Sequence, residues 1–265
     1  MLVDDYPHIP KVRWGHGKPP HHRLEMLVAA GTVRYAQFLQ RILKYREPLW
    51  NIAVDEPESP IEPFYRNMFF PGLDCAALYT FVAELNPRSY IEIGSGNSTK
   101  FVARAIRDQS LKTQVTSIDP NPRADIDALC DRNIRSPLED CNPAIFEEME
   151  QGDILFFDGS HRCLQNSDVT CFFLEVIPRL PSGVVIHIHD IFLPEDYPPE
   201  WFDRSYSEQY LLAVFLMAKN DPANVLLPNS YVSSRRQFTK VLDSLWDDPR
   251  LASVERHGHS FWFEA

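Results

Sequence analysis

The hydrophobic positions of the chain follow two different patterns, and the first of them predicts helix. From His21 to about Tyr45, apolar residues recur mostly at steps of three and four, with Arg and Lys between them. This spacing is typical of a helix with one apolar face, and Gly31 marks an interruption. The prolines and glycines of residues 1–20 instead predict an irregular arm, because they break regular elements.

A second pattern begins near residue 70, after a proline-rich stretch at 57–63, and Asp74 is placed to cap the helix that opens it. Short segments that are apolar throughout then alternate with segments of helical spacing, as in a mainly parallel sheet covered by helices on both faces. We therefore expect an α/β fold, a doubly wound and mainly parallel sheet with an N-terminal helical extension, divided into residues 1–70 and 71–265. The predicted strands are 89–93, 114–118, a segment around Ile134, 153–157, 183–189, 224–227 and 260–263, and the helices between them are 98–107, 125–132, 167–180, 207–218 and 233–245.

Composition and charge exclude several classes of function. The 26 Lys and Arg residues against 37 Asp and Glu give a net charge of −11, which disfavours nucleic acid and anionic membranes as partners. With 44% hydrophobic residues the chain can bury a core, yet its longest apolar runs fall far below the ~20 residues of a membrane span. Acidic residues follow Met1 where a secretory signal would carry cations, so we expect a cytoplasmic protein.

A glycine-rich turn provides the first candidate binding site. The predicted strand 89–93 runs into Gly94-Ser95-Gly96 and then into a helix. Ligands of open α/β sheets bind at the carboxyl ends of strands, where glycines let them approach the backbone closely. The acidic Glu92 just before the turn suits a cationic amine better than a pyrophosphate.

Asp119 ends the next strand, about 20 residues after the turn, where a carboxylate can accept hydrogen bonds from both hydroxyls of a ribose. A dinucleotide-binding fingerprint would need a third glycine, and the chain has Thr99 in that place. A NAD-dependent oxidoreductase is therefore the weaker alternative.

An ordered set of strand ends extends this picture. It comprises the turn Glu92-x-Gly94-x-Gly96, Asp119, the strand leading through Asp158 to His161, and the strand that ends in His189-Asp190. From about residue 70 to the C-terminus, the chain resembles class I S-adenosylmethionine-dependent methyltransferases. It is most similar to the small-molecule O-methyltransferases with an added N-terminal helical region, akin to those that act on catechols and sugars.

The resemblance implies a Rossmann-like, seven-stranded sheet whose last two strands form a hairpin, with the final strand antiparallel to the rest. It also implies that the turn lies against the methionine part of S-adenosylmethionine, that Glu92 holds the amino group, and that Asp119 binds the ribose. The adenine would lie beside the loop after the third strand. The implied cofactor-binding residues are Glu92, Gly94, Ser95, Gly96, Asp119, Leu138, Glu139 and Asp158.

Asp158 and Asp190 end two apolar strands and should reach the same edge of the sheet as Asp119. Carboxylates gathered there need pairing, hydrogen bonds or a cation, and a shared Mg²⁺ or another divalent ion would supply one. The resemblance to metal-dependent O-methyltransferases places Asp158 and Asp190 at ligand positions. His189 stands where those enzymes often carry a carboxylate, which leaves three readings: a softer metal, a histidine ligand, or no metal.

Histidines near this edge are candidates for proton transfer. His161 follows Asp158 by three residues, and either His161 or His189 is suited to remove a proton from a substrate hydroxyl, because the pKa of histidine lies near neutrality. We expect His187, deeper in the same strand, to be a core residue. The loop 192–201 beside Asp190 is either a lid over the substrate or a rigid connection.

These observations predict methyl transfer from S-adenosylmethionine to a hydroxyl of a small molecule or sugar, with residues 1–70 selecting the acceptor. Besides the oxidoreductase, two alternatives stay open: a catalytically silent cofactor-binding or scaffold protein, and a metal-dependent hydroxylase on the same scaffold. The sequence leaves homo-oligomer formation open.

Overall fold

A seven-stranded sheet forms the centre of the molecule. The structure is a computed structural model and describes residues 9–265. Its strands lie in the order β3-β2-β1-β4-β5-β7-β6, which confirms the predicted doubly wound, Rossmann-like sheet. The strands are β1 (Ser89–Ile93), β2 (Gln114–Ile118), β3 (Arg132–Ile134), β4 (Ile154–Phe157), β5 (Val185–Ile188), β6 (Val225–Pro228) and β7 (Phe261–Glu264).

The first five strands are all parallel, whereas β7 runs antiparallel to both of its neighbours, β5 and β6. This confirms the expected hairpin at the end of the sheet. All four residues of β4 and of β5 are buried, as expected for strands covered on both faces. Because the first five strands share one direction, their carboxyl ends meet at one edge.

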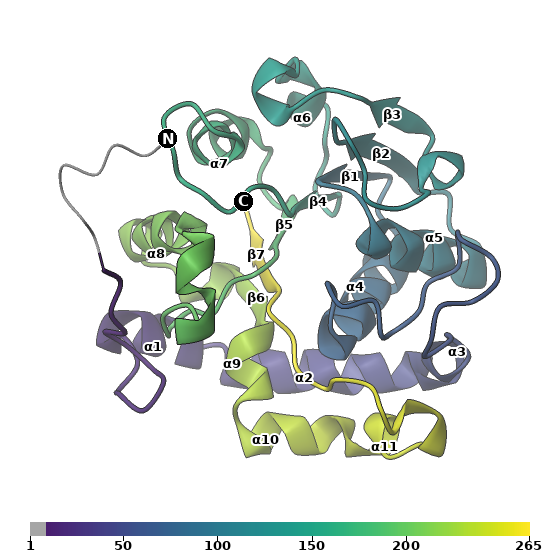
Figure 1. The fold of residues 1–265 in the computed structure, drawn as a ribbon, viewed down its shortest axis with the longest axis horizontal. Coiled ribbons are helices and arrows are strands. Elements are labelled where there is room, and N and C mark those ends of the chain that lie inside the picture. Colours follow the sequence, from purple (N-terminus) through teal and green to yellow (C-terminus); the bar gives the residue numbers. More distant parts are fainter. Residues whose placement is uncertain (1–8) are drawn as a thin grey trace.

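Helices cover the two faces of the sheet (Figure 1). On one side α4 (Gly72–Leu85) packs against α5 (Asn97–Gln109). The other side carries α6 (Ala144–Glu147), α7 (Asp168–Cys171) and α8 (Glu208–Lys219). After α7 the helical path continues as a π-turn and a 3₁₀ turn to Arg179. The short helices α9 (Asn229–Ser233), α10 (Arg236–Thr239) and α11 (Asp243–Trp246) fill the connection between β6 and β7.

The N-terminal helices pack onto this core. They are α1 (His22–Ala29), α2 (Thr32–Ile42) and α3 (Arg46–Trp50), with the break between α1 and α2 at the predicted Gly31. Helix α1 lies against α8, and α2 lies against α4 and β6. The ring of Phe38 stacks on Phe81, which stacks on Trp262 of β7, so the apolar core continues from the extension into the sheet. The division at residue 70 stays a prediction.

The predicted helix 125–132 is wrong. This segment forms only a three-residue 3₁₀ turn, Asp127–Leu129, and then enters β3. Only Ile126 is buried among residues 125–132, so the segment lacks the apolar stripe that would hold a helix on the sheet.

The predicted arm spans residues 1–20, of which 1–8 lie outside the described residues. Residues 9–20 form no helix or strand, as predicted. Within residues 9–265, none of the helices is both long and apolar enough to span a bilayer.

Candidate functional site

The carboxyl ends of the parallel strands place the predicted site residues side by side. Backbone hydrogen bonds run from Gly94 N to Ile118 O (3.1 Å), from Asp158 N to Ile93 O (2.9 Å) and from His189 N to Phe157 O (3.1 Å). The residues that follow β1, β2, β4 and β5 therefore meet at one edge, as predicted.

The two glycines of the turn after β1 have different surroundings. Gly94 has a φ of +80°, and a Cβ at this position would lie 1.9 Å from the carbonyl oxygen of Asp158. Only glycine fits there. A Cβ on Gly96, in contrast, would meet no atom within 4 Å, so this residue faces open space.

Asp119 holds the turn in place. Its Oδ2 accepts a hydrogen bond from Ser95 N (2.8 Å) and its Oδ1 accepts one from Asn121 N (2.7 Å). The Ser95 hydroxyl also pairs with that of Ser117 in β2 (2.8 Å). Asp119 is half-buried, so its remaining lone pairs stay open to a ligand.

Glu92 is fully buried beneath the turn. The hydroxyls of Ser98 and Thr99 donate to its two oxygens, the latter at 2.6 Å. Burial is the main reason that the pKa of Glu92 is raised to about 8. The two hydrogen bonds lower this pKa, and the charges of Asp158 and Asp119 raise it. Within residues 9–265 no cationic side chain pairs with it, so the carboxyl group lacks the partner that a buried charge needs.

The two residues predicted beside the adenine lie after β3, in a 3₁₀ turn at Leu138–Asp140. Leu138 is buried and Glu139 is exposed. Their part in binding stays a prediction.

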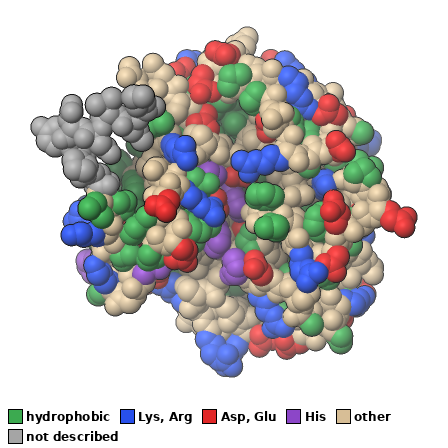
Figure 2. Space-filling view, in the orientation of Figure 1, with side chains coloured by type: hydrophobic (Ala, Val, Ile, Leu, Met, Phe, Trp, Pro, Cys, Tyr) green, Lys and Arg blue, Asp and Glu red, His purple; other side chains and the backbone are tan. Residues whose placement is uncertain are grey.

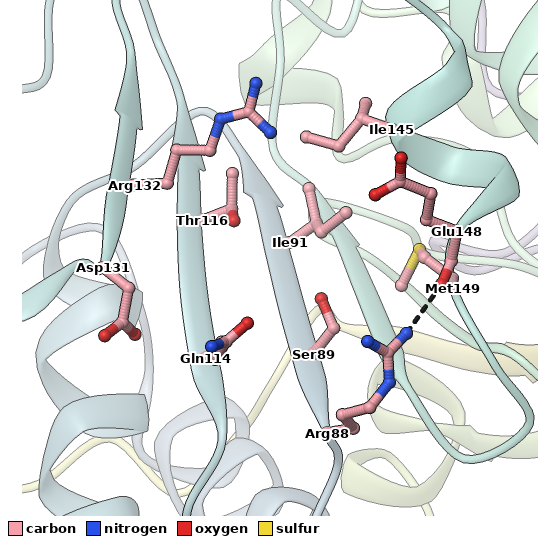
Figure 3. A pocket seen from close by; sticks show the side chains of 10 residues that line it. All are labelled: Arg88, Ser89, Ile91, Gln114, Thr116, Asp131, Arg132, Ile145, Glu148 and Met149. Carbon is pink, nitrogen blue, oxygen red and sulfur yellow. Dashed lines mark hydrogen bonds between the residues drawn. The ribbon is translucent and has the colours of Figure 1, made fainter.

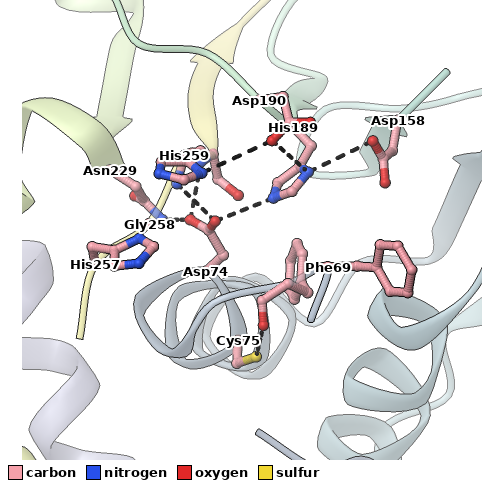
Figure 4. Close-up of polar contacts among 12 residues, drawn as sticks. Phe69, Asp74, Cys75, Asp158, His189, Asp190, Asn229, His257, Gly258 and His259 are labelled. Atoms are coloured by element: carbon pink, nitrogen blue, oxygen red, sulfur yellow. Dashed lines mark hydrogen bonds and ion pairs between the residues drawn. The ribbon is translucent and has the colours of Figure 1, made fainter. Parts of the chain in front are cut away.

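Asp158, His189 and Asp190 form a compact cluster after β4 and β5 (Figure 4). One donor atom from each lies within 4.8 Å of the others. Neighbouring residues of an extended strand point to opposite faces, but Asp190 has a φ of +57°, and this left-handed turn lets its side chain join that of His189. Such a conformation costs of the order of 1 kcal/mol or more in a non-glycine residue and is found preferentially at functional sites.

His161 joins the cluster from the loop after β4, also with a positive φ, +61°. Its Nε2 lies 3.2 Å from Asp158 Oδ1 and 3.6 Å from Asp190 Oδ2. Its Nδ1 donates to Glu208 Oε1 at 2.5 Å. Burial alone lowers the pKa of His161, but Glu208 and Asp158 outweigh it and raise the pKa well above 6.5.

Two acidic residues of the site come from helices and were not predicted to take part. Glu208, in the first turn of α8, is fully buried, and burial raises its pKa to about 7. Asp74, in the first turn of α4, is also fully buried and accepts a hydrogen bond from His189 Nε2 (3.2 Å). The sequence placed Glu208 only within the predicted helix 207–218, and Asp74 was expected only to cap a helix.

His187 is a core residue, as predicted. Its ring stacks between Phe156 (4.0 Å) and Trp262 (3.8 Å), and its Nε2 pairs with Ser260 Oγ at 2.6 Å. Burial lowers the pKa of His187 well below its usual value, so the ring stays neutral.

The loop after Asp190 is held by hydrogen bonds to two other segments. Asp196 accepts hydrogen bonds from Arg13 N (2.6 Å) and Trp14 N (3.0 Å) of the N-terminal arm. The Gln209 side chain accepts from Phe192 N (2.9 Å) on the other side. Of the two expectations for residues 192–201, these contacts favour the rigid connection.

Two hollows of the molecule differ in what they offer a ligand. Figure 2 shows histidine side chains gathered in a hollow near its centre, with basic and acidic side chains around it. A separate hollow of about 270 Å³ lies beside α6 on the face of β1 to β3 and contains none of the strand-end acids (Figure 3). It is lined by Arg88, Ser89, Ile91, Gln114, Thr116, Asp131, Arg132, Ile145, Glu148 and Met149.

The sheet order with a reversed β7, and the glycine turn between β1 and α5, are those of the Rossmann-like methyltransferase fold. Residues 91–191, which contain all the strand-end acids, match the family described as "Methyltransferase domain". The resemblance to class I S-adenosylmethionine-dependent methyltransferases is thus confirmed for this part of the chain.

Solved structures with a similar fold include several methyltransferases. The S-adenosylhomocysteine-bound PaMTH1 of Podospora anserina is 16% identical, with a TM-score of 0.40, over 70% of this chain and 80% of that one. The O-methyltransferase of Bacillus cereus is 15% identical, with a TM-score of 0.39, over 91% and 100%. MycE, from the mycinamycin pathway and in complex with Mg, is 16% identical with a TM-score of 0.35, and this chain spans only 43% of it. A comparison with curated proteins gave no significant match.

Proposed function

We propose that the protein transfers the methyl group of S-adenosylmethionine to a hydroxyl of a small molecule or sugar. This proposal rests on one observation: the glycine turn after β1 and the cluster of Asp158, His189 and Asp190 lie at the same edge of the sheet. The turn suits the cofactor, and the cluster suits chemistry at a hydroxyl group. The sulfonium of the cofactor carries the reactive methyl, so the protein has to align donor and acceptor, exclude water and remove the hydroxyl proton.

The turn offers three complementary contacts for the cofactor. The space in front of Gly96 admits the methionine part, and the half-buried Asp119 accepts from the ribose hydroxyls. The buried Glu92, which has no cationic side chain beside it in residues 9–265, fits the ammonium group of the ligand. Ser95 holds the turn against Asp119, and Asp158 borders it through the close approach of its carbonyl to Gly94.

The cluster supplies the chemistry at the acceptor. Asp158 and Asp190 fit a divalent cation, which when bound would lower the pKa of an acceptor hydroxyl. His161 faces both carboxylates, and Glu208 orients its ring. Glu208 first, and then Asp158, raise the pKa of His161, so a cation bound at Asp158 would lower this pKa toward the range of a general base.

Replacing Asp119 by alanine should weaken S-adenosylmethionine binding by about 10- to 100-fold, since a charge-assisted hydrogen bond contributes about 1.5–3 kcal/mol. Calorimetric titration of the wild type and of Asp119→Ala measures the effect, with NAD as a second titrant. Asp125→Ala, an exposed acid of the same loop, is the matched control. Unchanged affinity in Asp119→Ala would remove the ribose role, and tight binding of NAD alone would favour the oxidoreductase.

Only turnover separates an enzyme from a silent binding protein. Incubating the protein with S-adenosylmethionine and a panel of hydroxylated small molecules should yield a product heavier by one methylene, detected by mass spectrometry. Cofactor binding without product from any acceptor class would support the scaffold alternative, and an oxygenated product would support the hydroxylase.

Replacing Glu92 by glutamine should make stability less dependent on pH. The folded pKa of Glu92, about 8, lies above its ordinary value of 4.5, so the folded state binds the extra proton between these limits. The wild type should therefore lose stability as pH rises from about 5 to 8, and Glu92→Gln should not, with a difference of the order of a few kcal/mol at pH 8.

Thermal unfolding at a series of pH values measures this difference, with Glu175→Gln, an exposed glutamate, as the control. Saturating S-adenosylmethionine should stabilise the wild type more than Glu92→Gln, because its ammonium compensates the carboxylate. Parallel pH profiles for wild type and Glu92→Gln would show that Glu92 is not the buried acid described above.

A further inference from the structure

We propose that Asp74 fixes His189 as a nitrogen ligand of a metal centre with Asp158 and Asp190, and that this centre prefers a transition-metal ion such as Zn²⁺ or Fe²⁺ to Mg²⁺. This inference rests on the proposed function, in which a cation at these carboxylates assists the acceptor, and goes beyond it by naming the ligand set and the class of metal.

Asp74 is built to hold other groups in place. Its Oδ1 accepts hydrogen bonds from Asn229 Nδ2 (2.6 Å) and Ser260 N (2.9 Å). Its Oδ2 accepts from His259 N (2.7 Å) and from His189 Nε2 (3.2 Å). All four donors come from the second half of the chain, so a carboxylate on α4 fixes the side chain of His189 against the loop that enters β7 (Figure 4).

The hydrogen bond to Asp74 uses Nε2 of His189 and leaves Nδ1 free to bind a metal ion. With the proton on Nε2, the lone pair of Nδ1 faces the carboxylates. Nδ1 lies 3.6 Å from Asp158 Oδ1 and 3.5 Å from Asp190 Oδ1. Donors about 2.1 Å from one ion stand about 3.0 Å apart in an octahedron and about 3.4 Å apart in a tetrahedron, so these spacings need little adjustment.

The arrangement of Asp74, His189 and the carboxylates matches a general feature of metal sites. A ligating histidine usually donates its other N–H to a carboxylate or carbonyl, which orients the ring and raises its basicity. His161 has an equivalent partner in Glu208, but its nitrogen is not in the group of donors that lie within 4.8 Å of one another. His161 thus stays available for proton transfer, and His189 does not.

The nitrogen ligand sets the class of metal. Mg²⁺ prefers oxygen ligands and water, whereas imidazole favours Zn²⁺, Fe²⁺ and related ions. A centre with one histidine and two aspartates should therefore bind Zn²⁺ and the probe ion Co²⁺ more tightly than Mg²⁺, by at least about 100-fold.

Calorimetric titration of the metal-free protein with Zn²⁺ and with Mg²⁺, and visible absorption spectra of the Co²⁺ form, test this inference without an assay of activity. Asp74→Asn should lose about 10- to 100-fold in Zn²⁺ affinity. Asn229→Ala, which removes a hydrogen bond to Asp74 Oδ1 and leaves His189 untouched, is the matched control and should keep it. His189→Asp should lose the preference for Zn²⁺ and change the Co²⁺ spectrum.

Equal affinities of the wild type for Zn²⁺ and Mg²⁺, or a Zn²⁺ affinity unchanged in His189→Asp, would overturn the inference. Equal losses in Asp74→Asn and Asn229→Ala would reduce Asp74 to a structural residue and overturn its positioning role. The same samples are titrated with S-adenosylmethionine. Cofactor binding without metal binding defeats this inference alone, and metal binding without cofactor binding defeats the proposed function alone.

Discussion

Replacing His161 by alanine is expected to lower the rate of methyl transfer by about 10²- to 10⁴-fold, the range typical of a lost general base. Its Nε2 lies beside Asp158 and Asp190, where the acceptor hydroxyl would bind, whereas the nitrogen of His189 that faces these carboxylates, Nδ1, is the proposed metal ligand. The affinity for S-adenosylmethionine should change little, because the glycine turn and Asp119 lie on other strands.

The measurement is kcat with an acceptor found by the mass-spectrometric screen, alongside calorimetry with the cofactor. His257→Ala, an exposed histidine before β7, serves as the control. Glu208→Gln should give a smaller loss of kcat than His161→Ala, since it removes the orienting charge and keeps the ring. A His161→Ala protein with more than about a tenth of wild-type kcat would exclude this residue as the base.

Replacing Gly94 by alanine should destabilise the protein by about 3 kcal/mol or more, among the largest effects of any single substitution here. The added Cβ would lie 1.9 Å from the Asp158 carbonyl, and the φ of +80° disfavours any side chain. The ends of β1 and β4 would have to separate, and the cofactor site lies between them.

Gly96→Ala provides the matched comparison, because the same methyl group there meets no atom within 4 Å. Its thermal midpoint should stay close to that of the wild type, whereas its affinity for S-adenosylmethionine should fall, since the methyl group occupies the space proposed for the ligand. Thermal unfolding of both variants measures the change in stability, and calorimetry measures the change in affinity for S-adenosylmethionine. A stable Gly94→Ala, or a Gly96→Ala with full affinity, would contradict this description of the turn.

The strand ends could be predicted from the sequence because their signals are local. Each of Asp119, Asp158 and Asp190 follows a short apolar run, and parallel strands bring such residues to one edge. The resemblance to a known family added the antiparallel last strand, which no periodicity indicated.

Asp74 and Glu208 could not be predicted because their roles depend on contacts between distant parts of the chain. Asp74 meets His189 across 115 residues, and Glu208 meets His161 across 47. Each opens a helix, a position where an acid is already explained by the helix dipole. The ring orientations of His161 and His189, on which their proposed roles rest, could not be predicted from local patterns either, since both depend on these helix acids.

The hydrogen bonds of Asp196 to the N-terminal arm constrain how a substrate can enter. An outward movement of the segment after Asp190 would also have to break the hydrogen bonds from Arg13 and Trp14 to Asp196. Phe69, 58% exposed and in the segment before α4, lies on the Asp158 side of the cluster in Figure 4, so an acceptor that binds at the cluster as proposed would be expected to pass this ring.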